Sequence, residues 1–378
     1  MSRVPLRFQV SKPLLAGREA EYVADAVETG WISGSGAYLD RLESAVSAFL
    51  GIEHGVAVTS GTAGLHLTCL SMGLKSGMDV IVPSLTYVAS ANAVTYCGAR
   101  PVFADSALDT WNATIESIVR AWTEKTVGVI AVHLYGLPAP IADIAVLCKQ
   151  RGAWLIEDCA ESFGAKHNGR FVGSFGDAAV LSFFGNKIIS TGEGGMIFVR
   201  DLDKRRLAVS LKGQGMDLES RYWHPIVGYN YRMTNVTAAI GLGQMEMAEY
   251  HINERRRVAA SYLKALAPLQ KEGLLRLPVE PNGYRNVYWL FSVVLNEGDR
   301  SYRNAVQTTL LEGHGVETRP FFVPMHRLPM YGSEHELPNA EFLGDHGINL
   351  PSYSGLKEEE IGEICAALAQ TLKRVRTQ

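Results

Sequence analysis

The chain has 378 residues, of which 47% are hydrophobic and 20% charged, so it can bury a large core without disulfide or metal staples. Its 36 Lys and Arg residues nearly balance its 39 Asp and Glu residues, which gives a formal net charge of −3. This balance argues against a dedicated nucleic-acid binder, because such proteins usually carry a strongly basic domain.

The cysteines and the N-terminus bear on where the protein works. The five cysteines are scattered and form no Cys-x-x-Cys pair, which argues against a disulfide framework or a cysteine zinc site. The first 15 residues lack the apolar core of a signal peptide, and no apolar run is long enough to span a bilayer. We therefore expect a soluble, cytoplasmic protein.

The first half of the chain alternates helices and strands. Two amphipathic helices are predicted first, over residues 18–29 and from about 38 to 50. The strands that follow are predicted over 56–58, 80–82, 102–104, 127–132 and 154–157, with helices between them over 62–72, 87–96, 115–122 and 141–150. Continuous apolar runs in repeated β-α-β units predict a largely parallel sheet that is buried on both faces.

The second half of the chain departs from this alternation. Strands over 178–183 and 196–199 follow each other without a clear helix, so at least one of them should leave the parallel pattern. The remaining predicted elements are a long Ala-rich helix from Met233 to about Leu266, a strand over 288–295, and helices over 302–312 and 357–375. We expect a large domain over residues 1–250 and a smaller one over 251–378.

Three segments carry residue types that point to chemistry. Ser60-Gly61-Thr62 joins a strand to a helix, where backbone N–H groups can bind a phosphate or where the serine simply caps the helix. Asp158 ends a buried strand, so it could be a helix cap, a metal ligand or the partner of a protonated ring nitrogen. Lys187 leaves another buried strand for a loop rich in Gly, Ser and Thr, where a desolvated amine can form an imine with a carbonyl group.

Together these three features match the needs of one cofactor. A phosphate-binding turn, a carboxylate for a ring nitrogen and an imine-forming lysine are what pyridoxal phosphate requires. Tyr87 follows another strand end and could stack on the cofactor ring, although a tyrosine there could also belong to the core or to an interface. The Gly-x-x-x-x-Gly-Lys pattern of a nucleoside-triphosphate loop is absent.

The same segments belong to a longer series of motifs. In chain order these are SGTAGLHL (60–67), PSLTYVASAN (83–92), EDCAESFGA (157–165), SFFGNK (182–187), TGEGGM (191–196) and GYNYRMTN (228–235). With them the chain resembles the DegT/DnrJ/EryC1/StrS family of sugar aminotransferases, of the fold-type-I class of pyridoxal 5′-phosphate enzymes. The resemblance implies an α/β fold: a large domain with a central seven-stranded, mostly parallel sheet flanked by helices, and a smaller C-terminal α/β domain. It also implies a homodimer whose two active sites are shared between the subunits.

The resemblance also implies roles for individual residues. Lys187 would be the Schiff-base lysine, and Asp158 the partner of the pyridine nitrogen. The other residues implied to hold the cofactor are Gly61, Thr62 and Ser182 at the phosphate, Tyr87 at the ring, Glu161 near the phenolic oxygen, and Asn230 at the phosphate of the neighbouring subunit. Many relatives have Gln in place of Glu161.

Four residues are candidates for substrate contacts, namely Arg232, Arg319, His326 and Ser33. A guanidinium group binds a carboxylate or a diphosphate through two parallel hydrogen bonds. An ion pair or a capped loop is the alternative for each of these residues. Gly64 stands where relatives usually have Ala, and we expect it to loosen the helix after the phosphate turn slightly, since glycine is unfavourable inside helices.

Within the family, the resemblance points to one substrate. The segments FFGNK (183–187), RYWHP (221–225) and TRPFF (318–322) resemble those of enzymes that move an amino group from L-glutamate to C4 of GDP-4-keto-6-deoxy-D-mannose. Their product, GDP-perosamine, serves lipopolysaccharide O-antigen synthesis. The alternatives are a family aminotransferase acting at C3 or C4 of a UDP- or dTDP-linked keto-sugar, and a pyridoxal-phosphate-binding regulator with little catalysis. We expect no metal, nucleic-acid or membrane partner.

Overall fold

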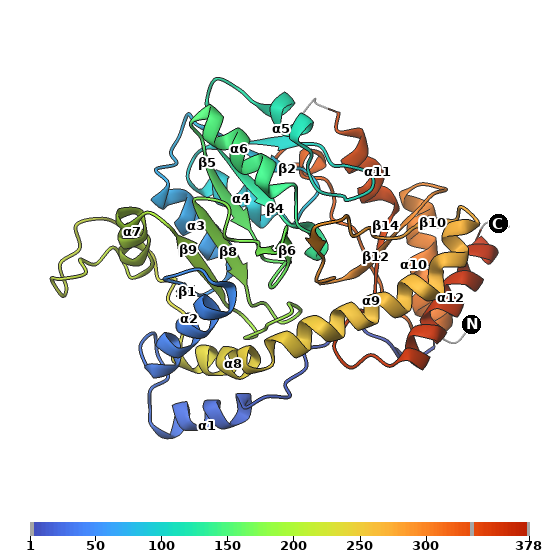
Figure 1. Ribbon diagram of the computed structural model, residues 1–378, viewed down its shortest axis with the longest axis horizontal. Helices are drawn as coiled ribbons and strands as arrows, with labels where there is room; N and C mark the ends of the chain where they lie inside the picture. Colours follow the sequence, from blue (N-terminus) through green and yellow to red (C-terminus); the bar gives the residue numbers. More distant parts are fainter. Residues whose placement is uncertain (1–3, 333–335, 376–378) are drawn as a thin grey trace.

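The structure is a computed structural model that describes residues 4–332 and 336–375 (Figure 1). Its central sheet has seven strands, in the spatial order β1 (Val56–Val58), β9 (Gly195–Val199), β8 (Ala178–Ser182), β5 (Trp154–Asp158), β4 (Thr126–Val132), β2 (Asp79–Pro83) and β3 (Arg100–Ala104). Neighbouring strands from β8 to β3 are parallel, whereas β9 is antiparallel to both β8 and β1. The expected mostly parallel sheet is confirmed, and β9 is the strand that departs from it.

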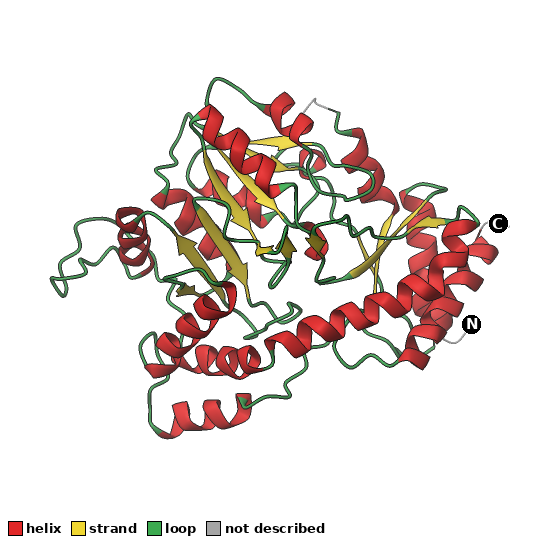
Figure 2. Cartoon of the chain, in the orientation of Figure 1, coloured by secondary structure: helices red, strands yellow, loops and turns green. Residues whose placement is uncertain are grey.

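Helices cover both faces of this sheet (Figure 2). One face packs against α3 (Gly61–Ser71), α4 (Ala89–Tyr96) and α7 (Leu202–Lys212), and the other against α2 (Ala37–Leu50), α5 (Ile115–Ala121), α6 (Ile141–Arg151) and α8 (Asn235–Glu246), with α1 (Glu19–Glu28) on α8. Successive residues of a strand face opposite sides, so Leu155 and Ile156 of β5 lie in different apolar cores. Burial on both faces explains why the strands read as continuous apolar runs.

Gly64 lies where α3 crosses the central sheet. A β-carbon at this position would come within 2.9 Å of a methyl group of Val180 and of one of Ile197. The glycine therefore allows α3 to pack closely on β8 and β9. We expected it only to loosen the helix, and the sequence could not show that the sheet lies so near.

A second sheet is built from the chain beyond residue 270. Its four antiparallel strands are β10 (Leu275–Arg276), β12 (Phe291–Leu295), β14 (Gly347–Leu350) and β13 (Arg319–Pro320). Helices α9 (Ala248–Lys271), α10 (Arg300–His314) and α12 (Glu358–Val375) enclose its core, in which the rings of Tyr262 and Phe291 stack at 4.6 Å. A short three-stranded sheet, formed by β11 (Tyr284–Arg285), β6 (Lys166–His167) and β7 (Arg170–Phe171), joins this part of the chain to the segment after β5.

The single long helix predicted from Met233 to about Leu266 is wrong in two respects. The structure divides it into α8 and α9 at Met247, whose φ of −108° and ψ of 11° are not helical, and α9 runs on to Lys271. The division has a packing cause: α8 is buried against α1 and α2, whereas α9 packs on the second sheet (Figure 1).

Other elements were not predicted, or have other bounds. Helices α7 and α11 (Pro338–His346) and strands β13 and β14 were not foreseen, because they are short or lack a clear period. The strand expected over 288–295 begins at Phe291, and the positive φ of 45° at Tyr288 is not a strand conformation. Among the described residues, no helix is both long and apolar enough to cross a membrane.

Candidate active site

A cavity of about 450 Å³ opens at the C-terminal ends of the central strands. The ends of β5 and β8 and the start of α3 form one side of the cavity, while the second sheet contributes Arg319 and Asn349, and the segment before β12 contributes Trp289. Eight of the predicted site residues line this cavity together, namely Gly61, Thr62, Tyr87, Asp158, Glu161, Ser182, Lys187 and Arg319.

One end of the cavity is the N-terminus of α3. The Ser60 hydroxyl accepts a hydrogen bond from the Ala63 N–H at 3.1 Å, so the serine does cap the helix. The N–H groups of Gly61 and Thr62 come earlier in the first turn and have no intrahelical acceptor. A β-carbon on Gly61 would lie 3.0 Å from the β-carbon of Ser182, so this turn presses against the end of β8. Two backbone N–H groups and a serine hydroxyl are donors suited to a phosphate.

Asp158 is the last residue of β5 and is almost fully buried. Its Oδ2 accepts a hydrogen bond from the Ser90 hydroxyl at 2.7 Å, and its Oδ1 accepts one from the Ala160 N–H at 3.1 Å. Burial raises the pKa of Asp158, while these two hydrogen bonds and the charge of Lys187 oppose the rise. A buried carboxylate of this kind gains most from a cationic partner, such as a protonated ring nitrogen.

Glu161 follows Asp158 on the same wall and is also buried. Its Oε2 accepts a hydrogen bond from the backbone N–H of Tyr135 at 2.8 Å. Tyr135 lies in the short 3₁₀ turn Leu134–Gly136 and has a φ of 52°, a strained value for a non-glycine residue. Desolvation raises the pKa of Glu161 to about 7, although the nearby Lys187 acts to lower it.

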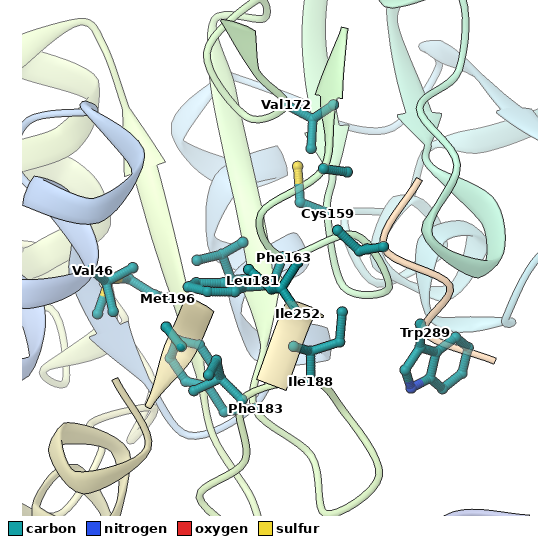
Figure 3. Close-up of a cluster of buried hydrophobic side chains, with 14 of the residues drawn as sticks. Val46, Cys159, Phe163, Val172, Leu181, Phe183, Ile188, Met196, Ile252 and Trp289 are labelled. Atoms are coloured by element: carbon teal, nitrogen blue, oxygen red, sulfur yellow. The ribbon is translucent and has the colours of Figure 1, made fainter. Parts of the chain in front are cut away.

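Lys187 stands in the loop that follows β8. Its flanking residues Phe183 and Ile188 are buried in the apolar cluster of Figure 3, which fixes the backbone on both sides of the lysine. Its Nζ lies 3.6 Å from the centroid of the Trp289 ring, and the Trp289 Nε1–H donates to the Asn186 carbonyl at 2.8 Å. Desolvation lowers the pKa of Lys187 against the opposing charges of the two neighbouring carboxylates. A larger fraction of the amine is then neutral, as a nucleophile or base requires.

The cavity fits pyridoxal phosphate by the chemistry of its donor groups. Phosphate donors at the start of α3, a buried carboxylate in Asp158 and a desolvated amine in Lys187 surround one space. Tyr87 lines the same space from the loop after β2, with 58% of its surface exposed and its ring 5.9 Å from that of Phe322. These are the groups that the cofactor's phosphate, ring nitrogen, aldehyde and ring face each need.

The structure does not bring the other predicted residues into this cavity. His326 is buried, with its Nδ1 2.7 Å from the Ser84 hydroxyl and its Nε2 3.0 Å from Glu341 Oε1. In this structure it therefore joins two elements and does not face the cavity. The side chains of Ser33, Asn230 and Arg232 are exposed and lie outside the lining of the cavity formed by this one chain. Three residues important to the site were not singled out from the sequence, namely Ser90, Tyr135 and Trp289.

A family model for the DegT/DnrJ/EryC1/StrS aminotransferase family matches residues 13–369. The chain belongs to this family. It is 41% identical over 362 residues to the GDP-perosamine synthase of Escherichia coli O157:H7, covering 95% of this chain and 97% of that protein. It is 44% identical over 374 residues to the GDP-perosamine synthase of Caulobacter vibrioides, covering 98% and 100%. The crystal structure of the aminotransferase TlmJ from Streptoalloteichus hindustanus superposes with a TM-score of 0.92 at 30% identity, covering 98% and 100%.

These similarities confirm the expected family, fold class, enzyme class and cofactor. The chain is an aminotransferase that uses pyridoxal phosphate, on a fold with a large, mostly parallel α/β sheet. The chemistry of the cavity and the family membership both lead to this conclusion.

Proposed function

We propose that the chain transfers the amino group of L-glutamate to C4 of GDP-4-keto-6-deoxy-D-mannose and so makes GDP-perosamine. One observation carries this proposal: the relatives at 41% and 44% identity over nearly the whole chain are both GDP-perosamine synthases. A similarity of this extent covers the cavity and the surrounding loops as well as the sheet. The product would serve the synthesis of a lipopolysaccharide O-antigen.

The residues of the cavity would divide the work. When bound, pyridoxal phosphate supplies an electron sink for the negative charge that develops on the reacting carbon. Lys187 would hold the cofactor. Its Nζ would accept the proton that leaves the α-carbon of glutamate and, in the second half-reaction, would deliver a proton to C4 of the sugar. Asp158 would hold the ring nitrogen protonated, and Glu161 would lie at the phenolic oxygen. Gly61 and Thr62 would bind the phosphate together with Ser182.

Arg319 is the candidate for the anionic groups of the substrates. It lies on β13, exposed, and lines the cavity from the side of the second sheet. Its guanidinium group would bind the carboxylate of glutamate or the diphosphate of the sugar through two parallel hydrogen bonds. Arg232 and Ser33 are candidates for the same groups from outside the cavity formed by this chain.

The assay is a reaction of the purified, cofactor-loaded protein with L-glutamate and GDP-4-keto-6-deoxy-D-mannose. We expect 2-oxoglutarate and the amino sugar in equal amounts, measured by a coupled assay and by mass spectrometry. Matched UDP- and dTDP-linked 4-keto and 3-keto sugars are the comparison. Faster turnover of one of these sugars would change the assigned substrate but not the family to which the chain belongs. No amino transfer to any of the sugars would refute the proposed function.

We also propose a homodimer with shared sites. The loop between α7 and α8 exposes large apolar side chains, with 75% of Tyr222, 65% of Trp223 and 91% of Val227 accessible, and an exposed apolar patch of this kind usually meets a partner. The same loop carries Asn230, which would reach the phosphate in the partner subunit's cavity. Mixing inactive Lys187→Ala and Asn230→Ala subunits should restore activity, because one hybrid site is then intact. A monomer in solution, or no restoration after mixing, would contradict the proposal.

We propose a domain boundary near residue 250, at the start of α9, where the chain leaves the large sheet for the second one. We also propose that the enzyme works in the cytoplasm, where nucleotide sugars and L-glutamate are available.

A further inference from the structure

Ser90 makes a contact that its position in the chain does not explain. It is the second residue of α4, and only 1% of its surface is accessible. Its hydroxyl donates to Oδ2 of Asp158 at 2.7 Å, across 68 residues of chain. A serine in the first turn of a helix normally caps its own helix or meets water. Here the hydroxyl leaves the helix and reaches a carboxylate at the end of a central strand.

The two oxygens of Asp158 are held by different donors. Ser90 holds Oδ2, and the Ala160 N–H holds Oδ1 at 3.1 Å. The backbone bond belongs to the turn after β5, whereas the hydroxyl comes from a separate helix. Together they fix the rotation of the carboxylate about its side-chain bonds. Without Ser90 only one of the two oxygens would be fixed.

The charged groups around Asp158 and its burial explain why the Ser90 hydroxyl affects the ionisation of this carboxylate. The titratable groups that face or adjoin the carboxylate are Lys187 after β8, His133 after β4, Glu161 in the next turn, and Glu157 and Cys159 on either side of it in the chain. Burial opposes ionisation of Asp158 and raises its pKa, and the Ser90 hydroxyl is the strongest of the groups that act against this rise. The hydrogen bond therefore favours the negative form in a site that otherwise disfavours it.

The first turn of α4, which contains Ser90, comes directly after the loop that carries Tyr87. The backbone N–H of Ser90 donates to the Tyr87 carbonyl at 3.4 Å, and the Tyr87 side chain lines the cavity. The start of α4 thus connects the loop that carries Tyr87 with the carboxylate at the end of β5. A shift of this turn would move both groups at once.

We propose that Ser90 is a positioning residue for Asp158, which it orients and keeps ionised for the ring nitrogen of the cofactor. This inference rests on the proposed role of Asp158. Ser90 itself neither transfers a proton nor acts as a nucleophile in the reaction. It acts through the Asp158 carboxylate.

The test measures binding of pyridoxamine 5′-phosphate to the cofactor-free full chain, since this form of the cofactor has no aldehyde to react with Lys187. Quenching of tryptophan fluorescence gives the dissociation constant from pH 5 to 9, because Trp289 lines the cavity. Loss of the Ser90 hydrogen bond to its charged form should raise the pKa of Asp158 further. The dissociation constant of Ser90→Ala should then exceed that of the wild type about tenfold on the acid side, and the ratio should fall as the pH rises. Titration of the ligand itself is common to both proteins and cancels in this ratio.

The control variants separate this role from packing. Ser71→Ala removes an equally buried hydroxyl from α3, one that donates to the Thr68 carbonyl, and it should leave binding unchanged at every pH. Ser90→Thr keeps the hydroxyl and should bind the ligand as the wild type does. Ser90→Val has the shape of the threonine side chain without the hydroxyl and should behave as Ser90→Ala. If Ser90→Ala does not fold, the comparison of Ser90→Thr with Ser90→Val tests the role of the hydroxyl.

The outcomes distinguish this inference from the proposed function. A loss of affinity that is the same at all pH values, or no difference between the threonine and valine variants, would overturn the role of Ser90. Asp158→Asn tests the site itself and should weaken binding strongly. If Asp158→Asn binds as the wild type does, the role of Asp158 falls, and the inference about Ser90 falls with it. If Asp158→Asn is weak while Ser90→Val is normal, the proposed function stands and only the inference about Ser90 fails.

Discussion

Replacing Glu161 with glutamine should stabilise the cofactor-free protein, and the gain should depend on pH. Glu161 is buried in the cavity wall, where its Oε2 accepts a hydrogen bond from the Tyr135 N–H at 2.8 Å. Its pKa is raised by desolvation from 4.5 to about 7. A glutamine has nearly the same shape, and its side-chain oxygen can accept the same hydrogen bond without a charge to desolvate.

The sign of the effect follows from proton binding. Between pH 4.5 and 7 the folded protein keeps a proton on Glu161 that the unfolded chain has already released, so the wild type loses stability as the pH rises. At about 1.36 kcal/mol for each pKa unit, the loss amounts to about 3 kcal/mol above pH 7. The unfolding entropy of about 2.1 cal/mol/K per residue converts this into a melting temperature roughly 4 °C higher for the variant, given a chain of 378 residues.

The assay is thermal unfolding of the cofactor-free wild type and Glu161→Gln at pH 5 and pH 8. The two proteins should melt together at pH 5, and the variant should melt higher at pH 8. Glu193→Gln is the matched control, because Glu193 lines the same cavity but is exposed, and it should show no such difference. An equal pH dependence in the wild type and Glu161→Gln would refute the reasoning that burial holds Glu161 neutral.

Three other substitutions test separate parts of the structure. Lys187→Ala should lose essentially all turnover yet still bind pyridoxamine 5′-phosphate, because it removes the amine but leaves the phosphate donors; normal turnover would exclude the proposed role. His326→Ala should lower stability by about 1–3 kcal/mol in urea unfolding, because it leaves Ser84 and Glu341 without their buried partner. The KM of the folded enzyme for both substrates should stay the same, and a large change in KM would return His326 to the substrate site. Gly64→Ala should also destabilise the protein, because overpacking costs about 1–3 kcal/mol and helix propensity returns roughly 1 kcal/mol, which leaves a net loss of up to about 2 kcal/mol. A higher melting temperature for this variant would contradict the close packing of α3 on the sheet.

The central sheet could be predicted because its signals are local. Each strand is an apolar run with both faces buried, and each crossover helix has its own period, so both show in short windows of sequence. The candidate residues at the strand ends stand out for the same reason, since Asp158 ends one apolar strand and Lys187 lies in the loop that follows another. Parallel strands place their C-terminal ends at one edge, which brings such residues together.

The rest of the site depends on tertiary contacts that leave no local signal. Trp289 reaches Lys187 from a segment about one hundred residues later, and nothing in its own surroundings marks it as a cavity residue. Ser90 resembles an ordinary serine at the start of a helix until the structure shows its hydroxyl on Asp158. The break at Met247 has the same origin, because it reflects the change from one core to the other and not the helix propensity of the chain.

The predicted residues that lie outside the cavity are not scattered at random. Ser33 and Arg232 come from segments some two hundred residues apart, yet the Arg232 side chain lies against Gly34, with its Cβ 3.3 Å from the place of a β-carbon there. The Ser33 carbonyl accepts a hydrogen bond from the Asn235 N–H at 2.6 Å, which ties the two segments together. Residues of this kind gathered on an exposed surface, away from the cavity of their own chain, are what a site completed by a second subunit requires. In the proposed homodimer, single substitutions among them would act on the partner's cavity, so mixed pairs of variants are a more decisive test of that proposal than any single variant.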